Sequence, residues 1–600
     1  MKSILSNIIA KHLEGLGLPQ PAEIVLDEPK AKEHGDLSSN VALVLAKAAK
    51  QPPPKLAAQL AESLGRETEI FEKIEVKGPG FINFFLKPTA YHASLKSLWQ
   101  DPNALKKLDL GRGTRVLVEF VSANPTGPMH VGHGRNAVVG DCISRLLEEV
   151  GFEVSREFYV NDHGVQIKTL GHSGCHYHTV MTEVRGVEIA LPEDVYKGQY
   201  LEDLVTELKD RIAPIKHDPL AVGKLLGVEL LETIKEELLR LNIVFSRYYS
   251  ESSLYDGGKI DEALAVLRAS GLTYEKEGAL WFKTSEYGDD KDRVLIKSDN
   301  TYTYLTPDIA YHKDKFDRGY DLYLNVMGAD HGGYTQRLKA AVAALGHNPD
   351  KLEFLLMQLV NLKRGGEVVN MSKRTGDYVT LHEVIDEVGK DAVRFFFMMR
   401  SHNATLDFDL ELAKQQSSDN PVFYIQYAHA RMSSIFRKAE EAGYPSAEAL
   451  GEVDLTPLQL EEEITLIKTL LAYPEMLKGA VQFREAHRVA FYLLDLAKTF
   501  QNYYTRAKGD DRYRVLTPHR ETTLAKLYLV KTLREVFFAQ PVHLAIGRGD
   551  RRSLPGLSLG SAIREDDLPG RHGAHHGQPA RHARVGSARS PHGEGASAAR

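Results

Sequence analysis

The sequence predicts an α/β protein: a Rossmann-type parallel sheet with a helical insertion, between a small N-terminal α+β domain and a C-terminal all-helical bundle. Three observations favour this fold class. The 600 residues exceed what one hydrophobic core usually holds, so several domains are expected. Residues 115–386 alternate short apolar runs with helical patterns, as parallel sheets covered by helices do. From about Val388 onward, apolar residues recur almost entirely at helical spacing.

The composition is that of an ordinary globular protein, with 43% hydrophobic and 26% charged residues. No apolar run reaches the roughly 18 to 20 residues that span a bilayer. Polar residues interrupt the N-terminal segment where a signal peptide has its apolar core. We therefore expect a cytoplasmic protein without a membrane partner. The net charge of −6 gives no overall attraction to nucleic acid, so such a partner must be bound by local patches.

Four segments are expected along the chain. Residues 1–105 form the α+β domain, in which Asp36, Ser38 and Ser39 can cap a helix and Gly78–Leu86 reads as a turn followed by a strand. Residues 106–386 contain the sheet, and long helical patterns between about 172 and 258 predict the insertion. Residues 387–539 form the bundle, and 540–600 form a tail.

The tail has an unusual composition. No lysine occurs in the 69 residues after Lys531, while arginine, glycine, histidine and proline become abundant and helical periodicity ends near Gln540. This pattern predicts disorder, or translation of a GC-rich gene in the wrong frame. The second interpretation would be excluded if neither alternative frame of the source DNA encoded a helix that completes the bundle.

The most informative stretch is Ser122–His133, SANPTGPMHVGH, which lies between a predicted strand and a predicted helix. The apolar run Val116–Val121 suits a strand covered on both faces, and apolar residues recur at helical spacing from Val138 to Val150. Open α/β sheets bind ligands at such junctions, because free backbone amides and the positive end of a helix favour anions there.

Two histidines, His130 and His133, stand three residues apart at this junction and therefore project to the same side. A zinc pair is disfavoured, because metal-binding helices of the hydrolase kind place histidines four apart with a glutamate between them. The two cysteines, Cys142 and Cys175, do not favour a thiolate metal site or a disulfide. A structural histidine pair leaves Gly132 unexplained, whereas a missing side chain lets a ligand approach the backbone. We therefore interpret the turn as a phosphate site for a nucleotide, with no metal bound by the chain.

A phosphate site also needs cations when negative charge develops on phosphate oxygens. The segment GGEVVNMSKRTGDYVTL supplies them, about 240 residues after the histidines, with Gly365 and Gly366 as a hinge before Lys373 and Arg374. A loop with lysine and arginine is by itself usually solvated surface. In combination with the histidine turn, however, this loop is a specific indication of a nucleotide site.

The two segments resemble the signatures of class I aminoacyl-tRNA synthetases: His130–His133 resembles the HIGH motif, and Asn370–Arg374 the KMSKS motif. YVNDHGVQI, YLTPD, MGADHGGY and YIQYAHAR are similar to arginyl-tRNA synthetases of the bacterial type, and the resemblance covers roughly residues 1–537. It implies an N-terminal domain that contacts the tRNA elbow and an anticodon-binding bundle. It also implies a monomer that uses ATP with Mg²⁺ to convert L-arginine into arginyl-adenylate and then transfers the arginyl group to tRNA(Arg).

The resemblance assigns roles to individual residues. His130 and His133 would stabilise the ATP phosphates, and Lys373 the departing pyrophosphate. Further ATP contacts would come from Gly132, Gly328, Asp330, His331, Met371, Ser372 and Arg374. Arginine would be bound by Glu119, Ser122, Asn124, Tyr304 and Asp308.

Glu119 gives a separate reason to expect a guanidinium. It lies near the end of a strand that reads as buried, and an unpaired buried carboxylate is very costly. Its partner is either a protein cation, such as Arg115 or Arg156, or the substrate's guanidinium, whose planar fork suits carboxylates bidentately. We therefore expect that an internal base already paired with Glu119, or a structure with the two signature segments on opposite faces of the molecule, would exclude the whole assignment.

Anticodon bases are read by exposed aromatic side chains beside cations. Each candidate in the bundle can equally be a core aromatic or a solvated charge. The candidates are Tyr424, Arg431, Gln501, Tyr504 and Arg506.

Two alternatives stay open. Asn370 replaces the first lysine of the KMSKS pattern, which leaves Lys373 as the principal cation, with Lys363 and Arg364 as helpers. This departure and the abnormal tail suggest a catalytically impaired relative that binds tRNA. A small-molecule nucleotidylyltransferase also carries an HxGH turn on this sheet topology, but such enzymes lack the long helical C-terminal domain.

Overall fold

The computed structural model describes residues 1–100, 108–183, 195–369 and 379–539. The N-terminal domain has one three-stranded antiparallel sheet of order β1-β3-β2. Helices α2 and α3 contact this sheet, and α1 packs on α3. The elements are α1 (Lys2–Gly15), β1 (Leu37–Ser39), α2 (Val41–Ala49), α3 (Pro53–Leu64), β2 (Phe71–Lys77), β3 (Phe81–Leu86) and α4 (Pro88–Gln100).

The strand predicted within residues 78–86 is confirmed as β3. The predicted helix caps are confirmed only in part. Ser38 and Ser39 lie in β1 and the N-cap residue of α2 is Asn40, but the Ser39 hydroxyl accepts from the Val41 amide at the start of α2 at 3.2 Å. Asp36 instead accepts a hydrogen bond from the Leu86 amide at 2.8 Å. A strand therefore precedes the helix where the sequence pattern showed only capping residues.

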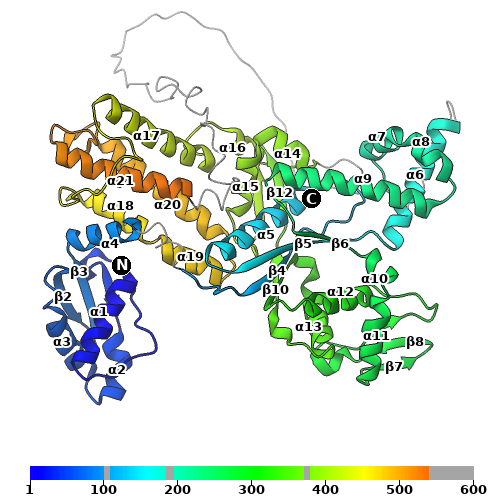
Figure 1. The fold of residues 1–600 in the computed structure, drawn as a ribbon, viewed down its shortest axis with the longest axis horizontal. Helices are drawn as coiled ribbons and strands as arrows, with labels where there is room; N and C mark the ends of the chain where they lie inside the picture. The colour runs from blue at the N-terminus through cyan, green and yellow to red at the C-terminus, as the bar shows by residue number, and fades with distance from the viewer. Residues whose placement is uncertain (101–107, 184–194, 370–378, 540–600) are drawn as a thin grey trace, which may run out of the picture. The chain divides into compact units, whose positions relative to one another are not determined.

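The central sheet has five parallel strands in the order β11-β10-β4-β5-β6 (Figure 1). The chain moves outward from β4 through β5 to β6, then returns to the other side of β4 to form β10 and β11. The order therefore reverses between β4 and β10, which is the switch point where open α/β sheets bind ligands. The predicted parallel sheet is confirmed. Its strands are β4 (Arg115–Glu119), β5 (Glu153–Val160), β6 (Arg247–Ser250), β10 (Leu322–Gly328) and β11 (Leu352–Met357).

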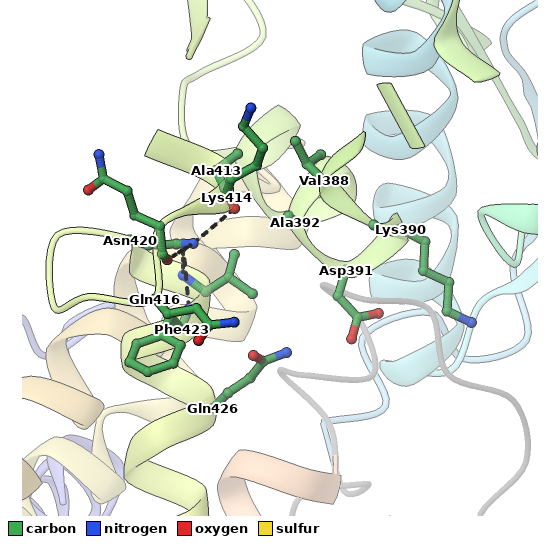
Figure 2. A pocket seen from close by; sticks show the side chains of 13 residues that line it. Val388, Lys390, Asp391, Ala392, Ala413, Lys414, Gln416, Asn420, Phe423 and Gln426 are labelled. Atoms are coloured by element: carbon green, nitrogen blue, oxygen red, sulfur yellow. Dashed lines mark hydrogen bonds between the residues drawn. The ribbon is translucent and has the colours of Figure 1, made fainter. Parts of the chain in front are cut away.

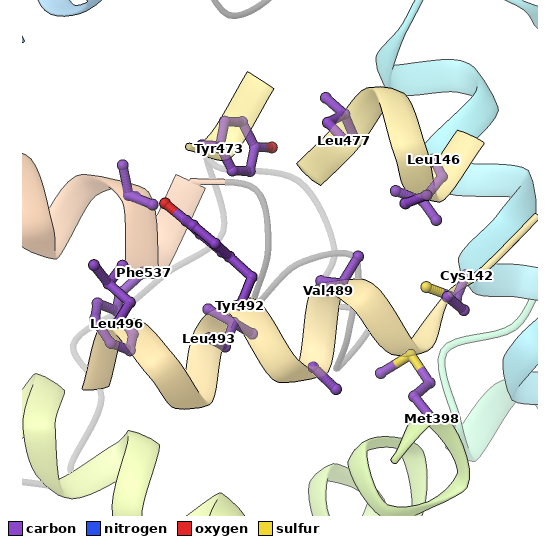
Figure 3. Close-up of a cluster of buried hydrophobic side chains, with 14 of the residues drawn as sticks. Cys142, Leu146, Met398, Tyr473, Leu477, Val489, Tyr492, Leu493, Leu496 and Phe537 are labelled. Carbon is purple, nitrogen blue, oxygen red and sulfur yellow. The ribbon is translucent and has the colours of Figure 1, made fainter. Parts of the chain in front are cut away.

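Helix α5 (Val131–Glu149) follows β4 and contacts β4, β5 and β10. Gly140 permits this approach, because a Cβ there would lie 2.5 Å from the Phe120 ring. Figure 3 shows Leu146 of α5 near Leu477 and Cys142 of α5 near Met398, within a cluster that also includes residues of the C-terminal helices. Burial raises the pKa of Cys142 to about 12, so this free cysteine is a neutral core thiol.

Two insertions extend the sheet domain. The first is helical and lies between β5 and β6; its helices run from residue 165 to 240, against about 172 to 258 expected from the pattern. Gly171 and Gly223 let α6 and α9 touch through their backbones, since a Cβ on either would overlap a carbonyl oxygen. These helices are α6 (Val165–Glu183), α7 (Gln199–Glu207), α8 (Lys209–Ile212) and α9 (Pro219–Arg240).

The second insertion lies between β6 and β10 and has a three-stranded antiparallel sheet, β7-β8-β9. Helix α13 then joins β10 to β11. The elements are α10 (Ser252–Asp256), α11 (Lys259–Ala269), β7 (Thr273–Lys276), β8 (Ala279–Phe282), β9 (Arg293–Ile296), α12 (Leu305–Asp317) and α13 (Thr335–Ala344).

A small sheet, β13-β12-β14, and three short helices follow the central sheet. The C-terminal helices then form the predicted bundle. The first group is β12 (Val360–Arg364), β13 (Glu367–Val368), α14 (Leu381–Val388), α15 (Lys390–Met398), β14 (Leu406–Asp409) and α16 (Leu410–Lys414). The bundle is α17 (Pro421–Glu441), α18 (Glu461–Leu471), α19 (Tyr473–Gln482), α20 (His487–Arg506) and α21 (Arg520–Ala539).

The bundle core contains Tyr492 of α20 next to Tyr473 of α19, with Phe537 of α21 in the same cluster (Figure 3). Within the described parts of the chain, no helix combines the length and the apolar character needed to cross a membrane. The predicted tail, residues 540–600, lies outside the described residues.

Candidate active site

The turn after β4 lies at the switch point and holds a strained backbone. Val121 has a φ of 67° and Ser122 a φ of 40°, a conformation that a β-branched residue rarely adopts. Asn136 of α5 fixes the turn: its Oδ1 accepts a hydrogen bond from the Val121 amide at 2.7 Å, and its Nδ2 donates to the Val326 carbonyl at 3.1 Å. One side chain thus joins β4, α5 and β10 where the chain leaves the strand.

His130 and His133 cap the start of α5 reciprocally. The Nδ1 of His130 accepts from the amides of Gly132 and His133 at 3.1 and 3.3 Å. The Nδ1 of His133 accepts from the His130 amide at 3.4 Å. The two rings stack with their centroids 3.8 Å apart, which confirms that both project to the same side.

This capping fixes the chemistry of the two imidazoles. Because each Nδ1 accepts from a backbone N–H, a neutral ring carries its proton on Nε2, where it can be donated to an anion. The expected free amides at Gly132 and His133 are wrong, because the His130 ring uses both. The structure gives a further reason for Gly132: a Cβ there would lie 2.9 Å from the His130 ring, so glycine also makes room for the capping imidazole.

The basic segment that should face this turn lies outside the described residues. This applies to Asn370, Met371, Ser372, Lys373 and Arg374. The residues that follow it are described and lie beside the histidine turn.

Directly after the basic segment, the Leu381 amide donates to the Met129 carbonyl at 2.8 Å, and Thr380 forms an antiparallel bridge with His130. Thr380 also caps α14 reciprocally with Glu383. Thr380 and Leu381, which follow this segment in the chain, therefore lie directly against the start of α5.

The two expected helper cations are engaged elsewhere. Lys363 pairs with Asp407 at 2.8 Å, and Arg364 pairs with Glu387 at 2.6 Å. The Arg364 hydrogen bond lowers the pKa of Glu387 to about 2. Lys363 thus pairs within the small sheet, from β12 to β14, and Arg364 pairs from β12 with a residue of α14.

Glu119, at the end of β4, is paired with an internal base. Lys315 of α12 has a fully buried side chain and donates to Glu119 Oε2 and, at 2.9 Å, to Asn325 Oδ1. The Ser122 hydroxyl donates to Glu119 Oε1 at 3.0 Å and accepts from the Tyr159 amide at 3.1 Å. Both carboxylate oxygens therefore have protein partners.

The expected partners of Glu119 were wrong. Arg115 donates to the Gly319 carbonyl at 3.2 Å, and Arg156 pairs with Glu148 at 2.6 Å. Lys315 was missed because it lies 196 positions from Glu119 in sequence. Charge balance at Glu119 alone consequently gives no reason for a guanidinium.

Two further carboxyl groups beside Glu119 give that reason. Burial raises the pKa of Asp308 to about 7; the Tyr334 hydroxyl, donating to its Oδ2 at 2.5 Å, opposes the shift, and the Glu119 charge adds to it. Burial and then the Asp308 charge raise the pKa of Glu251 to about 7 as well. Burial and mutual repulsion therefore outweigh the positive charge that the protein itself provides here.

Glu251 follows β6 and is only 7% exposed. The Tyr159 hydroxyl donates to its carboxyl group, and the charges of Glu251, Asp308 and Glu119 all contribute to raising the pKa of Tyr159, after its burial. The three carboxyl groups are thus close enough to one tyrosine for each charge to act on it. Tyr304, in contrast, is 74% exposed, and Tyr334 rather than Tyr304 bonds Asp308 within the described structure.

The remaining predicted substrate contacts lie at the same edge of the sheet. Asn124 is exposed in the turn after β4. Gly328 ends β10, and the exposed Asp330 curls over it, since a Cβ on Gly328 would lie 2.4 Å from Asp330 Oδ1. His331 Nε2 lies 3.7 Å from Asp330 Oδ2.

In the bundle, the structure brings three of the five anticodon candidates together. The Arg431 guanidinium lies 4.2 Å from the Tyr427 ring centroid and 4.9 Å from that of Tyr504, and it donates to Gln501 Oε1. Tyr424 is half-buried on the same helix as Arg431. Arg506 instead pairs with Glu462 at 2.7 Å.

A pocket of about 350 Å³ lies among residues of α15, α16 and α17 (Figure 2). Lys390, Lys414 and Phe423 line it, and Asn420 closes one side by donating to the Ala413 and Gln415 carbonyls. It contains none of the residues predicted to bind substrate, so we assign it no part in the nucleotide site.

Comparison with known proteins supports each domain. Family models match for the catalytic domain of class I tRNA synthetases (R) over residues 96–434, the arginyl tRNA synthetase N terminal domain over 3–86, and the DALR anticodon binding domain over 425–539. A curated arginine–tRNA ligase of Syntrophotalea carbinolica is 46% identical over 535 residues, which cover 88% of this chain and 95% of that protein.

The chain belongs to the arginyl-tRNA synthetase family. A second curated arginine–tRNA ligase, of Geobacillus thermodenitrificans, is 46% identical over 519 residues and covers 85% of this chain and 91% of that one. A solved chain from Campylobacter jejuni assigned to the same family is 33% identical with a TM-score of 0.66, covering 76% and 97%. The Thermus thermophilus arginyl-tRNA synthetase, 24% identical over 91% and 99% with a TM-score of 0.70, shares the fold.

For an arginyl-tRNA synthetase, a paired Glu119 is thus compatible with membership of the family, and the expectation that an internal base would exclude the assignment was too strict. Glu251 was the main residue that sequence reasoning missed. It lies within the stretch 172–258 that helical patterning assigned to the insertion, which concealed β6. The signal that could have found it is an acidic residue directly after the short strand-like run RYYS.

Proposed function

We propose that this arginyl-tRNA synthetase attaches arginine to tRNA(Arg) in an ATP-dependent reaction that passes through arginyl-adenylate. The observation that carries the proposal is the pair of buried carboxyl groups, Asp308 and Glu251, each with a pKa raised to about 7, beside Glu119. A guanidinium relieves this accumulated charge best, because its five N–H donors can reach several carboxylate oxygens at once. A lysine ammonium is a compact charge and leaves acceptors unpaired, so the pocket favours arginine.

The backbone end of arginine would lie toward the turn after β4. The Ser122 hydroxyl gives its hydrogen to Glu119 and one lone pair to the Tyr159 amide, so its remaining lone pair suits the α-ammonium group. Asn124 is exposed beside it and can bond the substrate's polar groups. We also propose that Tyr304, an exposed side chain four residues before Asp308, contacts the bound arginine.

In adenylate formation, a carboxylate oxygen of arginine attacks the α-phosphorus of ATP. The bond from that phosphorus to the oxygen of the leaving pyrophosphate breaks, which yields arginyl-adenylate and pyrophosphate. The Nε2–H groups of His130 and His133 donate to phosphate oxygens as negative charge grows, and Lys373 neutralises the pyrophosphate. Further contacts to ATP are proposed for Gly132, Gly328, Asp330, His331, Met371, Ser372 and Arg374.

Magnesium would enter with ATP as part of the substrate. Among the described residues, no group of three or more histidine, cysteine or acidic side chains can hold a metal ion. Mg²⁺ keeps most of its water and is commonly bound through substrate phosphates, so the triphosphate supplies its ligands here.

In the transfer step, a ribose hydroxyl at the tRNA 3′ end attacks the arginyl carbonyl and AMP leaves. We assign anticodon binding to the cluster around Arg431, where Tyr504 and Gln501 adjoin the guanidinium and Tyr424 lies on the same helix. Arg506 is a weaker candidate, because it is already paired with Glu462. We further propose that the protein acts as a monomer in the cytoplasm.

The test is arginine-dependent ATP–pyrophosphate exchange with tRNA present. His133→Ala and Lys373→Ala should each lower the exchange rate by about 10²- to 10³-fold, the usual effect of losing one donor to developing charge. His347→Ala, at the end of α13 and away from the turn, is the matched control and should retain activity. Near-normal exchange in both His133→Ala and Lys373→Ala would overturn these roles.

The competing functions make different predictions. The N-terminal and anticodon-binding domain matches favour a synthetase over a small-molecule nucleotidylyltransferase. An impaired relative would bind tRNA but fail to charge it, because Asn370 replaces a lysine. A charging assay with each amino acid and total tRNA separates these outcomes.

A further inference from the structure

Arg135 of α5 is a buried cation two residues after His133, and it is 1% exposed. Its Nη1 donates to the carbonyls of Gln358 and Leu359 at 2.9 and 3.4 Å, and its Nη2 donates to the Ser401 carbonyl at 2.9 Å. Its Nε has no acceptor among the described residues. Burial lowers the pKa of Arg135 to about 10 without an opposing carboxylate in the described structure. Within the described part of the chain, this buried guanidinium is thus held by main-chain carbonyls.

The other buried arginine near α5 is held differently. Arg394 of α15 donates to the Asp141 carboxylate at 2.7 Å and to the Leu241 carbonyl at 2.9 Å. Its charge is therefore balanced inside the core. Burying a cation without a counter-charge is costly, and well-packed apolar residues often serve stability better than buried charge does. Stability alone therefore does not explain why a buried arginine occupies position 135.

The carbonyls that Arg135 binds belong to two segments that meet next to the nucleotide site. Gln358 and Leu359 join β11 to β12, and Ser401 lies between α15 and β14. Backbone hydrogen bonds connect the two segments: Gln358 N to His402 O at 2.8 Å, and Leu406 N to Leu359 O at 3.0 Å. Arg135 therefore fixes this junction to the first turns of α5.

The junction leads directly into the β12–β13 hairpin, which ends at Val368, just before residue 370. On the far side of residues 370–378, Thr380 bridges to His130. The described chain is thus attached to the start of α5 on both sides of the KMSKS segment, by Arg135 before it and by the backbone bridge after it.

We propose that Arg135 is a positioning residue for adenylate formation, whose planar guanidinium sets the β12–β13 hairpin at a fixed place relative to the histidine turn. The inference rests on the proposed function, in which that turn and Lys373 share the ATP phosphates. A misplacement of about 1 Å far from the chemistry can cost on the order of 10²-fold in rate. Lysine cannot replace Arg135, because a single ammonium cannot reproduce the fork that spans carbonyls of two segments.

The test compares Arg135→Lys and Arg135→Gln with the control Arg394→Lys. Pyrophosphate exchange with tRNA gives kcat and the KM values for ATP and arginine, calorimetric arginine binding counts the folded sites, and thermal unfolding gives Tm. Both Arg135 variants should lose about 10- to 100-fold in kcat/KM for ATP per folded site, with the arginine KM changed by less than about twofold. Arg394→Lys should lower Tm while kcat/KM for ATP per folded site stays within about threefold.

The outcomes separate the two levels of inference. The positioning role is overturned if the Arg135 variants lose only Tm, or if neither variant folds well enough to bind arginine, because Arg135 is then purely structural. If His133→Ala abolishes exchange while Arg135→Lys keeps it, the positioning role fails alone. If His133→Ala and Lys373→Ala also keep normal exchange, the proposed function of the turn fails instead.

Discussion

Arginine affinity is expected to rise with pH, because two carboxyl groups of its pocket titrate near neutrality. Burial raises the pKa of Asp308 and of Glu251 to about 7; the Glu119 charge adds to the shift of Asp308, and the Asp308 charge adds to that of Glu251. The free enzyme therefore holds protons on these groups at pH 6, whereas a bound guanidinium requires the ionised carboxylates. Arginine binding must release protons below pH 7, and it needs no proton release well above pH 7.

The size of the effect follows from the fraction ionised. A single group with a pKa of about 7 is roughly 10% ionised at pH 6 and roughly 90% ionised at pH 8, so the arginine Kd falls about tenfold between them. Two independent groups would give about a hundredfold fall. Because Asp308 and Glu251 repel each other, they titrate as a pair, and the expected fall lies between about tenfold and a hundredfold.

The same shifts act on stability with the opposite sign. In the absence of arginine, the folded state holds more protons on these carboxyl groups than the unfolded state, since their folded pKa values lie above the usual 3.8 and 4.5. Their contribution to the free energy of unfolding is therefore largest below about pH 4 and is lost as pH rises through about 7.

The assay is isothermal titration calorimetry of arginine without ATP at pH 6, 7 and 8, in buffers of different ionisation enthalpy, which reports Kd and the protons released. Glu251→Gln should remove one titrating group, so that fewer protons are released at pH 6 and the pH dependence is shallower. Glu229→Gln, on the surface of α9, is the control. A Kd constant within about twofold from pH 6 to 8, or an unchanged proton count in Glu251→Gln, would refute the reasoning.

Three further predictions concern residues around the two sites. Lys315→Met leaves the largely buried Glu119 carboxylate without its cation. It should lower the free energy of unfolding, measured by urea titration, by about 3 to 5 kcal/mol. Adding Glu119→Gln should restore most of this loss, and no recovery would argue against the pairing. Asn136→Ala leaves the Val121 amide unpaired in a strained turn and should lower the free energy of unfolding by about 1 to 3 kcal/mol. Asn136→Asp keeps the acceptor oxygen and should lower it less. Equal losses in the two variants would show that Oδ1 is unimportant. Arg431→Met should raise the Kd for tRNA(Arg) about tenfold in filter binding and leave arginine affinity unchanged, and equal tRNA affinity would remove Arg431 from the anticodon site.

The parts of this structure that the sequence predicted are those that depend on local pattern. The nearly continuous apolar run Val116–Val121 indicated β4, because a strand covered on both faces is apolar throughout. The spacing of His130 and His133 indicated a shared helix face, which follows from the helical period of 3.6 residues. The cap itself was not predictable, because a histidine at a helix start does not reveal that its Nδ1 will accept two amides. The free-amide interpretation failed for that reason.

The cluster of carboxyl groups proposed to bind arginine could not be assembled from the sequence without the strand order. Glu251 follows β6, Glu119 ends β4, and Asp308 lies on α12, so their common position depends on parallel strands whose carboxyl ends share one edge. Lys315 and Asp308 lie on α12 seven positions apart, which at 3.6 residues per turn puts both on one helix face toward Glu119. Periodicity could have suggested that pair only if α12 had first been placed against β4.

The internal Lys315 also changes how arginine selectivity should be understood. With Glu119, Asp308 and Glu251 ionised, three carboxylates and one ammonium leave the pocket a net charge of −2. Arginine and lysine both bring one side-chain cation and one α-ammonium group, so overall charge does not distinguish them. Lys315 already satisfies Glu119 Oε2, which leaves Asp308 and Glu251, on different elements, as the acceptors that an incoming cation must reach together. A guanidinium has five N–H donors that can bond both carboxylates, whereas an ammonium is a single point charge, so the proposed preference for arginine rests on donor geometry rather than on the number of charges.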